Sequence, residues 1–154
     1  MPIVMDNTLN LIRSTAMGGG NRADKAKHLA DGIRKLGEYR WVGIYDVGAE
    51  EVSILAWSGP AAPEFSKFLV THGLTGAAIE EKKPVIVGDV RNDPRYLTAF
   101  GSTLSEIIVP VLSPDGAVIG TVDVESAHPN AFTDRDAEMI ERCIAAALPL
   151  WLIR

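Results

Sequence analysis

The stretch that decides the fold runs from Glu106 to Ser126 and reads EIIVPVLSPDGAVIGTVDVES. Two runs rich in valine and isoleucine lie on either side of residues 113–116 (SPDG), a segment with the composition of a tight turn. The stretch therefore predicts a β-hairpin with strands over 106–112 and 117–126.

The hairpin also predicts which side chains share a face. If the turn centres on Pro114 and Asp115, Glu106 lies opposite Asp123 in the paired strand. Because side chains alternate between faces, Glu106, Asp123 and Glu125 lie together on one face at the end away from the turn. The other face carries only apolar residues: Ile107, Val109, Val111, Val118, Val122 and Val124.

Three carboxylates on one patch of sheet require an explanation. Two of them directly opposite each other destabilise a sheet, and the third follows about 7 Å along the strand. Three remedies are open: full solvent exposure, a neighbouring basic side chain, or a bound cation. The candidate basic neighbours are Arg40, Arg91 and Arg95. The cluster is thus either a solvated or salt-bridged strand end, or a site for an ammonium group or a metal.

The remaining elements surround this hairpin. Apolar periodicity predicts helices over 6–17, 21–37, 77–82 and 133–148. Strands are expected over 41–47, 52–57 and 84–87. The segment 65–70 reads as a short helix or irregular chain, and 89–102 as a long loop. Strands joined by hairpins, with helices at both ends, predict an α+β domain with a largely antiparallel sheet.

Composition excludes several classes of protein. The 154 residues suit a single domain. The net charge of −5 and the absence of a Lys/Arg run leave no footprint for nucleic acid. The N-terminal segment is too polar for a signal peptide, and no apolar run approaches the length that spans a bilayer. The single cysteine, Cys143, favours a reducing compartment, so we expect a cytoplasmic protein. From the charge and the lack of a long apolar run, we expect no nucleic-acid and no membrane partner.

Other chemistry-bearing residues offer weaker signals. The aromatic residues Tyr45 and Trp57 on the first predicted hairpin either pack in the core or form an aromatic pocket wall. Cys143 lies in an apolar stripe of the last helix, a setting typical of a structural thiol. The histidines lack the spacing of metal ligands, and no phosphate-binding glycine loop is present. The sequence therefore predicts neither a metal site nor a cofactor.

Six blocks of the chain resemble the GAF domains of the free methionine-(R)-sulfoxide reductase group. These blocks are Trp41–Tyr45, Gly73–Ala78, Val87–Val90, Ser105–Pro110, Gly120–Ser126 and Asn130–Asp136. The resemblance implies a GAF-like (PAS-like) antiparallel six-stranded sheet, with N- and C-terminal helices packed on one face and a pocket on the other. It implies one GAF domain over 1–154, with an N-terminal helix and glycine-rich link at 1–20 and a core domain at 21–152.

The same resemblance bears on activity. The enzymes of this group use cysteines on pocket loops, and the corresponding positions fall on Thr75, on Ala99 and near Phe65. Cys143 lies in a different element. A hydroxyl cannot replace a thiolate that must form a disulfide. The family's acidic residues, which hold the polar part of a free amino acid, match Glu106, Asp123 and Glu125.

We therefore expect a non-catalytic sensor or regulatory domain that binds a small ligand and takes part in signalling. The ligand would be amino-acid-like or an amine, and a homodimer would form through the terminal helices. Two alternatives stay open: a reductase-like enzyme, degenerate or with other chemistry, and a dimerisation module with a vestigial pocket. The predicted ligand-binding residues are Glu106, Asp123, Glu125, Tyr45, Trp57 and Thr75.

Overall fold

The structure is a computed structural model that describes residues 2–96 and 101–153. Its elements, in chain order, are α1 (Pro2–Met17), α2 (Arg22–Gly37), β1 (Trp41–Val47), β2 (Glu51–Ser58), β3 (Lys67–Leu69), α3 (Gly73–Glu81), β4 (Val85–Val87), the 3-10 helix η1 (Val90–Asn92), β5 (Ser105–Leu112), β6 (Val118–Ser126), α4 (Asp134–Ala147) and α5 (Pro149–Leu152). Within the described residues, no helix is both long and apolar enough to cross a membrane.

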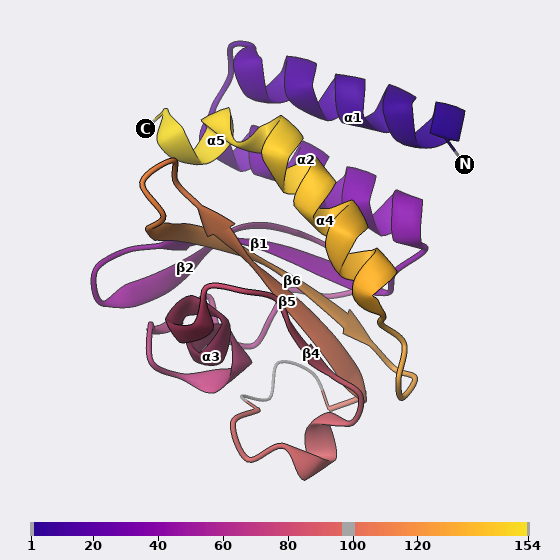
Figure 1. Cartoon of the computed structure of the whole chain (residues 1–154), viewed down its shortest axis with the longest axis vertical. Helices are drawn as coiled ribbons and strands as arrows, with labels where there is room; N and C mark the ends of the chain where they lie inside the picture. The colour runs from indigo at the N-terminus through magenta and orange to yellow at the C-terminus, as the bar shows by residue number, and fades with distance from the viewer. Residues whose placement is uncertain (1, 97–100, 154) are drawn as a thin grey trace.

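The strands form one antiparallel sheet of six in the order β3-β2-β1-β6-β5-β4. Helices α2 and α4 lie across one face of this sheet, with α1 as an outer layer and α5 beside them (Figure 1). Helix α3 lies on the opposite face, below β5 (Figure 1). This arrangement confirms the predicted α+β fold and the packing of the terminal helices on one face.

The helix ends follow local rules. The side chain of Asn21 accepts a hydrogen bond from the N–H of Asp24 at 2.8 Å and so caps the start of α2. Thr133 and Asp136 form a capping box at the start of α4. Both helices bury an apolar stripe, which packs with the apolar face of β5 and β6 in the main core.

The strand register differs from the prediction. Glu106 pairs with Glu125, and Ile108 pairs with Asp123. The ladder shifts at Val111 and Leu112, where Ile119 has no partner and forms a bulge. The bulge and the wider turn together move the pairing by two residues. From Gly120 onward this even shift leaves each side chain of β6 on its predicted face. The three acids therefore still share a face, although Glu106 and Asp123 are not directly opposite.

Three further predictions were wrong in detail. Val118 packs with the aromatic cluster of β1 rather than in the helix-side core, because the bulge follows it directly. The segment 65–70 contains a strand, β3, which is formed by pairing with the edge of β2. Helix α3 begins at Gly73, before the predicted start at 77, and Gly73 has a left-handed φ of +69° there.

Candidate functional site

The three acidic side chains lie together on the face of the sheet that carries α3. Glu106 is on β5, and Asp123 and Glu125 are on β6. Only 5%, 6% and 1% of their respective surfaces is exposed. Solvent exposure, the first remedy for their mutual repulsion, is therefore excluded.

Few hydrogen bonds reach these carboxyl groups. Glu125 accepts a bond from the Tyr96 hydroxyl at 3.2 Å and another from the Thr103 side chain. Glu106 and Asp123 lie within hydrogen-bonding reach of each other, which requires one of them to hold a proton. Within the described residues, no N–H or O–H group donates to Glu106 Oε2, Asp123 Oδ1 or Glu125 Oε2. One oxygen of each acid thus has no donor in the described protein.

Burial makes these acids hard to ionise. Loss of solvent raises the pKa of Asp123 to about 7. Burial, followed by repulsion from Asp123, raises the pKa of Glu125 to about 8. The same two causes raise the pKa of Glu106 well above its ordinary value. Near neutral pH the cluster is therefore poised between protonated and ionised forms.

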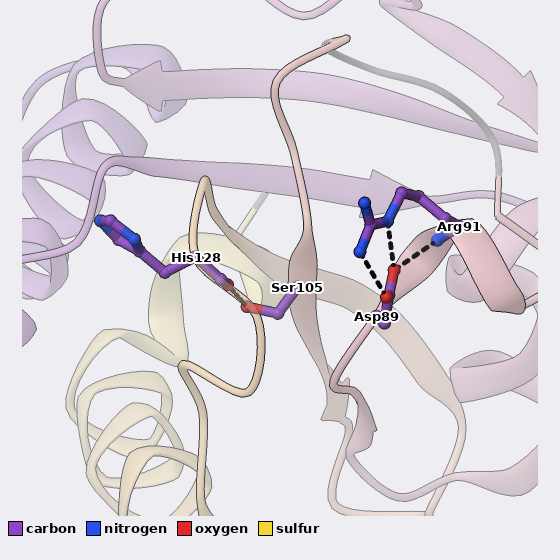
Figure 2. A network of polar contacts seen from close by, with 4 residues as sticks. All are labelled: Asp89, Arg91, Ser105 and His128. Carbon is purple, nitrogen blue, oxygen red and sulfur yellow. Dashed lines mark hydrogen bonds and ion pairs between the residues drawn. The ribbon is translucent and has the colours of Figure 1, made fainter.

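The expected basic neighbours do not reach the cluster. Arg91 pairs with Asp89, as Figure 2 shows, and Arg95 pairs with Asp93. Arg40 donates to Ser102. In the parts of the chain that the structure describes, no Lys, Arg or His nitrogen lies within 4.0 Å of an oxygen of the three acids. Each of the three candidate arginines has another polar partner, so the alternative of a neighbouring basic side chain has no support among the described residues.

A cavity opens beside Glu106 and Asp123. It is narrow, with about 30 Å³ of room for the centres of water-sized atoms, which is space for about two water molecules. Its walls combine the two acids with aromatic side chains and the start of α3. The lining residues are Tyr45, Pro63, Phe65, Phe68, His72, Gly73, Leu74, Thr75, Glu106 and Asp123.

The predicted site residues are distributed as follows. Tyr45 and Thr75 line the cavity together with Glu106 and Asp123, and Glu125 lies next to Asp123 along β6.

Trp57 is not a lining residue and packs with the aromatic cluster instead. It pairs with Gly43, and the rings of Trp41 and Tyr45 fill the space above that glycine.

Several lining residues were not predicted from the residue pattern. Pro63, Phe65 and Phe68 come from the segment around the short edge strand β3, and His72 and Leu74 come from the start of α3. Phe65 was noted only through the family resemblance. Neither segment has a long periodic pattern, so the isolated phenylalanines were the one local signal of an apolar wall.

Local hydrogen bonds hold the end of the sheet near the acids. The Ser105 hydroxyl donates to the carbonyl oxygen of His128 at 2.6 Å (Figure 2). The N–H of Leu104 donates to the carbonyl of Ser126, and the N–H of Val90 donates to that of Leu104. The chain before β5, the chain after β6 and η1 are therefore tied together beside the carboxyl cluster.

A family model described as GAF domain matches residues 22–147. The chain belongs to the GAF domain family. It is 28% identical over 140 residues to GAF domain-containing protein A of Dictyostelium discoideum, covering 90% of this chain and 87% of that protein. It is 32% identical over 108 residues to free methionine-R-sulfoxide reductase of Saccharomyces cerevisiae, covering 68% of this chain and 59% of the yeast protein.

Solved structures agree with this assignment. A type II free methionine-R-sulfoxide reductase from Thermoplasma acidophilum has a TM-score of 0.74 and 28% identity, covering 84% of this chain and 95% of that one. The free methionine-R-sulfoxide reductase from Neisseria meningitidis, solved with its substrate, has a TM-score of 0.78 and 25% identity, covering 94% and 89%. The predicted resemblance to a GAF domain of the reductase group is confirmed.

The only cysteine of this GAF domain lies away from the cavity. Cys143 is fully buried in α4, on the opposite side of the sheet from the three acids. Burial raises the pKa of its thiol to about 12, so the thiolate is scarce at neutral pH. Thr75, at one expected cysteine position, lines the cavity. Ala99, at another, lies outside the described residues.

Proposed function

We propose that this GAF domain is a non-catalytic sensor or regulatory domain that binds a small cationic ligand, amino-acid-like or an amine, between the carboxyl cluster and an aromatic wall. The observation that carries the proposal is the cluster itself: three buried acids, each with an oxygen that receives no hydrogen bond from the described residues. A buried charge of this kind is costly unless a partner compensates it. An ammonium group would supply both the charge and the missing donors.

The chemistry of the site favours an ammonium group over a metal ion. Among the described residues, no group of three or more His, Cys, Asp or Glu side chains is arranged to hold a metal. Tyr45 and Phe68 pack edge-on against each other beside the acids, with ring centroids 5.8 Å apart. Such aromatic rings suit an ammonium-bearing ligand with an apolar part.

A thermal-shift screen of free amino acids and primary amines at pH 8 tests the proposal. A ligand that binds only the folded chain raises the melting temperature, and the rise grows with the logarithm of the ligand concentration above Kd. Glu106→Gln should abolish the shift. Glu51→Gln is the matched control, because Glu51 is an exposed glutamate on β2. If Glu106→Gln keeps the full shift, the ligand binds elsewhere and the proposed site is wrong.

The similarity to free methionine-R-sulfoxide reductases favours a second candidate, the reduction of a sulfoxide in the same cavity. Against it stand the single cysteine and its position on the far side of the sheet. A methionine-R-sulfoxide assay with dithiothreitol as reductant separates the two. We expect no turnover; turnover that Cys143→Ser abolishes would reject a non-catalytic role.

A further inference from the structure

Glu125 differs from the other two acids in what it contacts. Glu106 and Asp123 line the cavity, whereas Glu125 does not. It is also the most deeply buried of the three, with 1% of its surface exposed. Its carboxyl group accepts hydrogen bonds from the Tyr96 hydroxyl, at 3.2 Å, and from the Thr103 side chain. These hydrogen bonds join Glu125 to the chain before β5 rather than to the cavity.

The two donors lie on the segment that leads into β5. The Tyr96 ring packs against the apolar cluster that α3 shares with β4 and β5, and Thr103 is buried. The next residue, Leu104, donates its N–H to the carbonyl of Ser126 at 2.8 Å. Because Ser126 directly follows Glu125 in β6, the Glu125 side chain and the backbone beside it hold the same segment.

The charge of Glu125 is opposed by its neighbours. Asp123 lies two residues earlier on the same face of β6, about 7 Å away along the strand. Glu106 pairs with Glu125 from β5, Tyr45 approaches the acids from β1, and Tyr96 approaches from the segment before β5. Within the described residues, no Lys, Arg or His nitrogen lies within 4.0 Å of the Glu125 oxygens.

We propose that Glu125 is a positioning residue, which anchors the segment before β5 through Tyr96 and Thr103, and that this anchor tightens when the charge on Asp123 is compensated. The anchor belongs to the free chain and needs no ligand. Its tightening rests on the proposed function, in which a bound cation compensates Asp123. A ligand that does not touch Glu125 would thus change how firmly a segment outside the cavity is held.

The direction of the coupling follows from the ionisation of Glu125. Burial, and then repulsion from Asp123, raises the pKa of Glu125 from 4.5 to about 8 in the closed anchor. Opening the anchor admits water to the carboxyl group and brings its pKa back toward the ordinary value. The resulting stabilisation of the closed anchor is fully present below about pH 4.5 and is lost as the pH rises through about 8. Compensation of Asp123 removes one of the two causes and so favours the closed anchor.

Two substitutions test the anchor itself. Glu125→Gln keeps the side-chain length and a carbonyl acceptor, whereas Glu125→Leu has a similar volume and no acceptor. Amide hydrogen exchange, followed by NMR on the whole chain at pH 6, reads the N–H groups of Tyr96 and Leu104, which donate to Asp93 and Ser126. We expect their protection factors to fall at least about fivefold in Glu125→Leu and to stay within about twofold in Glu125→Gln.

The amide of Val122, in a strand paired on both sides, reports global unfolding. Unchanged protection of Tyr96 and Leu104 in Glu125→Leu, or a fall no larger than the fall at Val122, would overturn the anchor. Should Glu125→Leu fail to fold, Tyr96→Phe replaces it. This variant removes one donor and should lower the protection of Leu104 at least about twofold; an unchanged value would again overturn the anchor.

The second experiment tests the coupling to Asp123. Protection factors, which correct for the pH dependence of intrinsic exchange, are compared at pH 6 and pH 8.5 without ligand. For Tyr96 and Leu104 in the original chain they should fall at least about fivefold, because ionisation of Glu125 favours the open anchor. The fall should vanish in Glu125→Gln and be clearly smaller in Asp123→Asn. Asp115→Asn, in the exposed hairpin turn, is the control and should behave like the original chain.

The outcomes separate this inference from the proposed function. An equal fall in Glu125→Gln would assign the pH response to another group, and an unaltered fall in Asp123→Asn would remove the link to the cavity. Either result overturns the coupling. If no amine or amino acid raises the melting temperature in the thermal-shift screen, the proposed function is wrong, while the exchange measurements on the free chain still decide the anchor.

Discussion

Replacing Asp123 by asparagine should make the unliganded protein more stable at alkaline pH. Burial raises the pKa of Asp123 from 3.8 to about 7 in the folded chain. The folded state thus holds this proton more tightly than the unfolded state does. The resulting stabilisation is fully present below pH 4 and is lost as the pH rises through about 7.

The size of the effect follows from the two pKa values. Between pH 5 and pH 8, ionisation of Asp123 should lower the free energy of unfolding by about 3 kcal/mol. Asp123→Asn removes this loss, and it also removes the charge that raises the pKa of Glu106 and Glu125. The variant should therefore lose less stability than the original chain over this range, and should bind the proposed ligand more weakly.

Urea denaturation at pH 5 and pH 8 without ligand measures this directly. Asp115→Asn is the control. Asp115 lies in an exposed turn, and hydrogen bonds lower its pKa, of which the bond from the Ser113 side chain has the largest effect. That lowered pKa affects stability only at acidic pH, so the control should shift the two measurements equally. The reasoning is refuted if the original chain is equally stable at pH 5 and pH 8, or if Asp123→Asn changes both values by the same amount.

Three further outcomes are expected. Gly120→Ala should destabilise the fold by about 1–3 kcal/mol in urea denaturation, because a Cβ there would overlap the Trp151 ring. Gly19→Ala is the control and should be near neutral, because the space around Gly19 is open. Tyr39→Phe should lower the free energy of unfolding by about 1–3 kcal/mol, since the Tyr39 hydroxyl donates to the Asp136 carboxylate at 2.5 Å. An unchanged midpoint in urea denaturation would contradict this contact. Cys143 should react with a thiol reagent only as fast as the chain unfolds, because it is fully buried; rapid labelling of the native protein would show that α4 opens locally.

The hairpin shows how far local pattern reaches. Alternation along 106–126 correctly placed Glu106, Asp123 and Glu125 on one face, and it placed most of the valines and isoleucines on the other. The exact pairing was missed, because the bulge at Ile119 depends on how the turn closes. A shift of two residues keeps each side chain on the same face of the sheet, so the predicted acidic face was right. The same shift changes which residues lie directly opposite each other, so the predicted pairs were wrong.

The amino-acid sequence by itself determined the hairpin, the helix caps, the acidic face and the resemblance to the GAF family, because each depends on residues close together in the chain or on short motifs. Only the tertiary structure decided that the acids are buried, that the arginines bind elsewhere, and that β3 and α3 supply the cavity walls. Burial, pKa and cavity shape arise where segments far apart in the chain pack together. Such packing depends on contacts that no local pattern records.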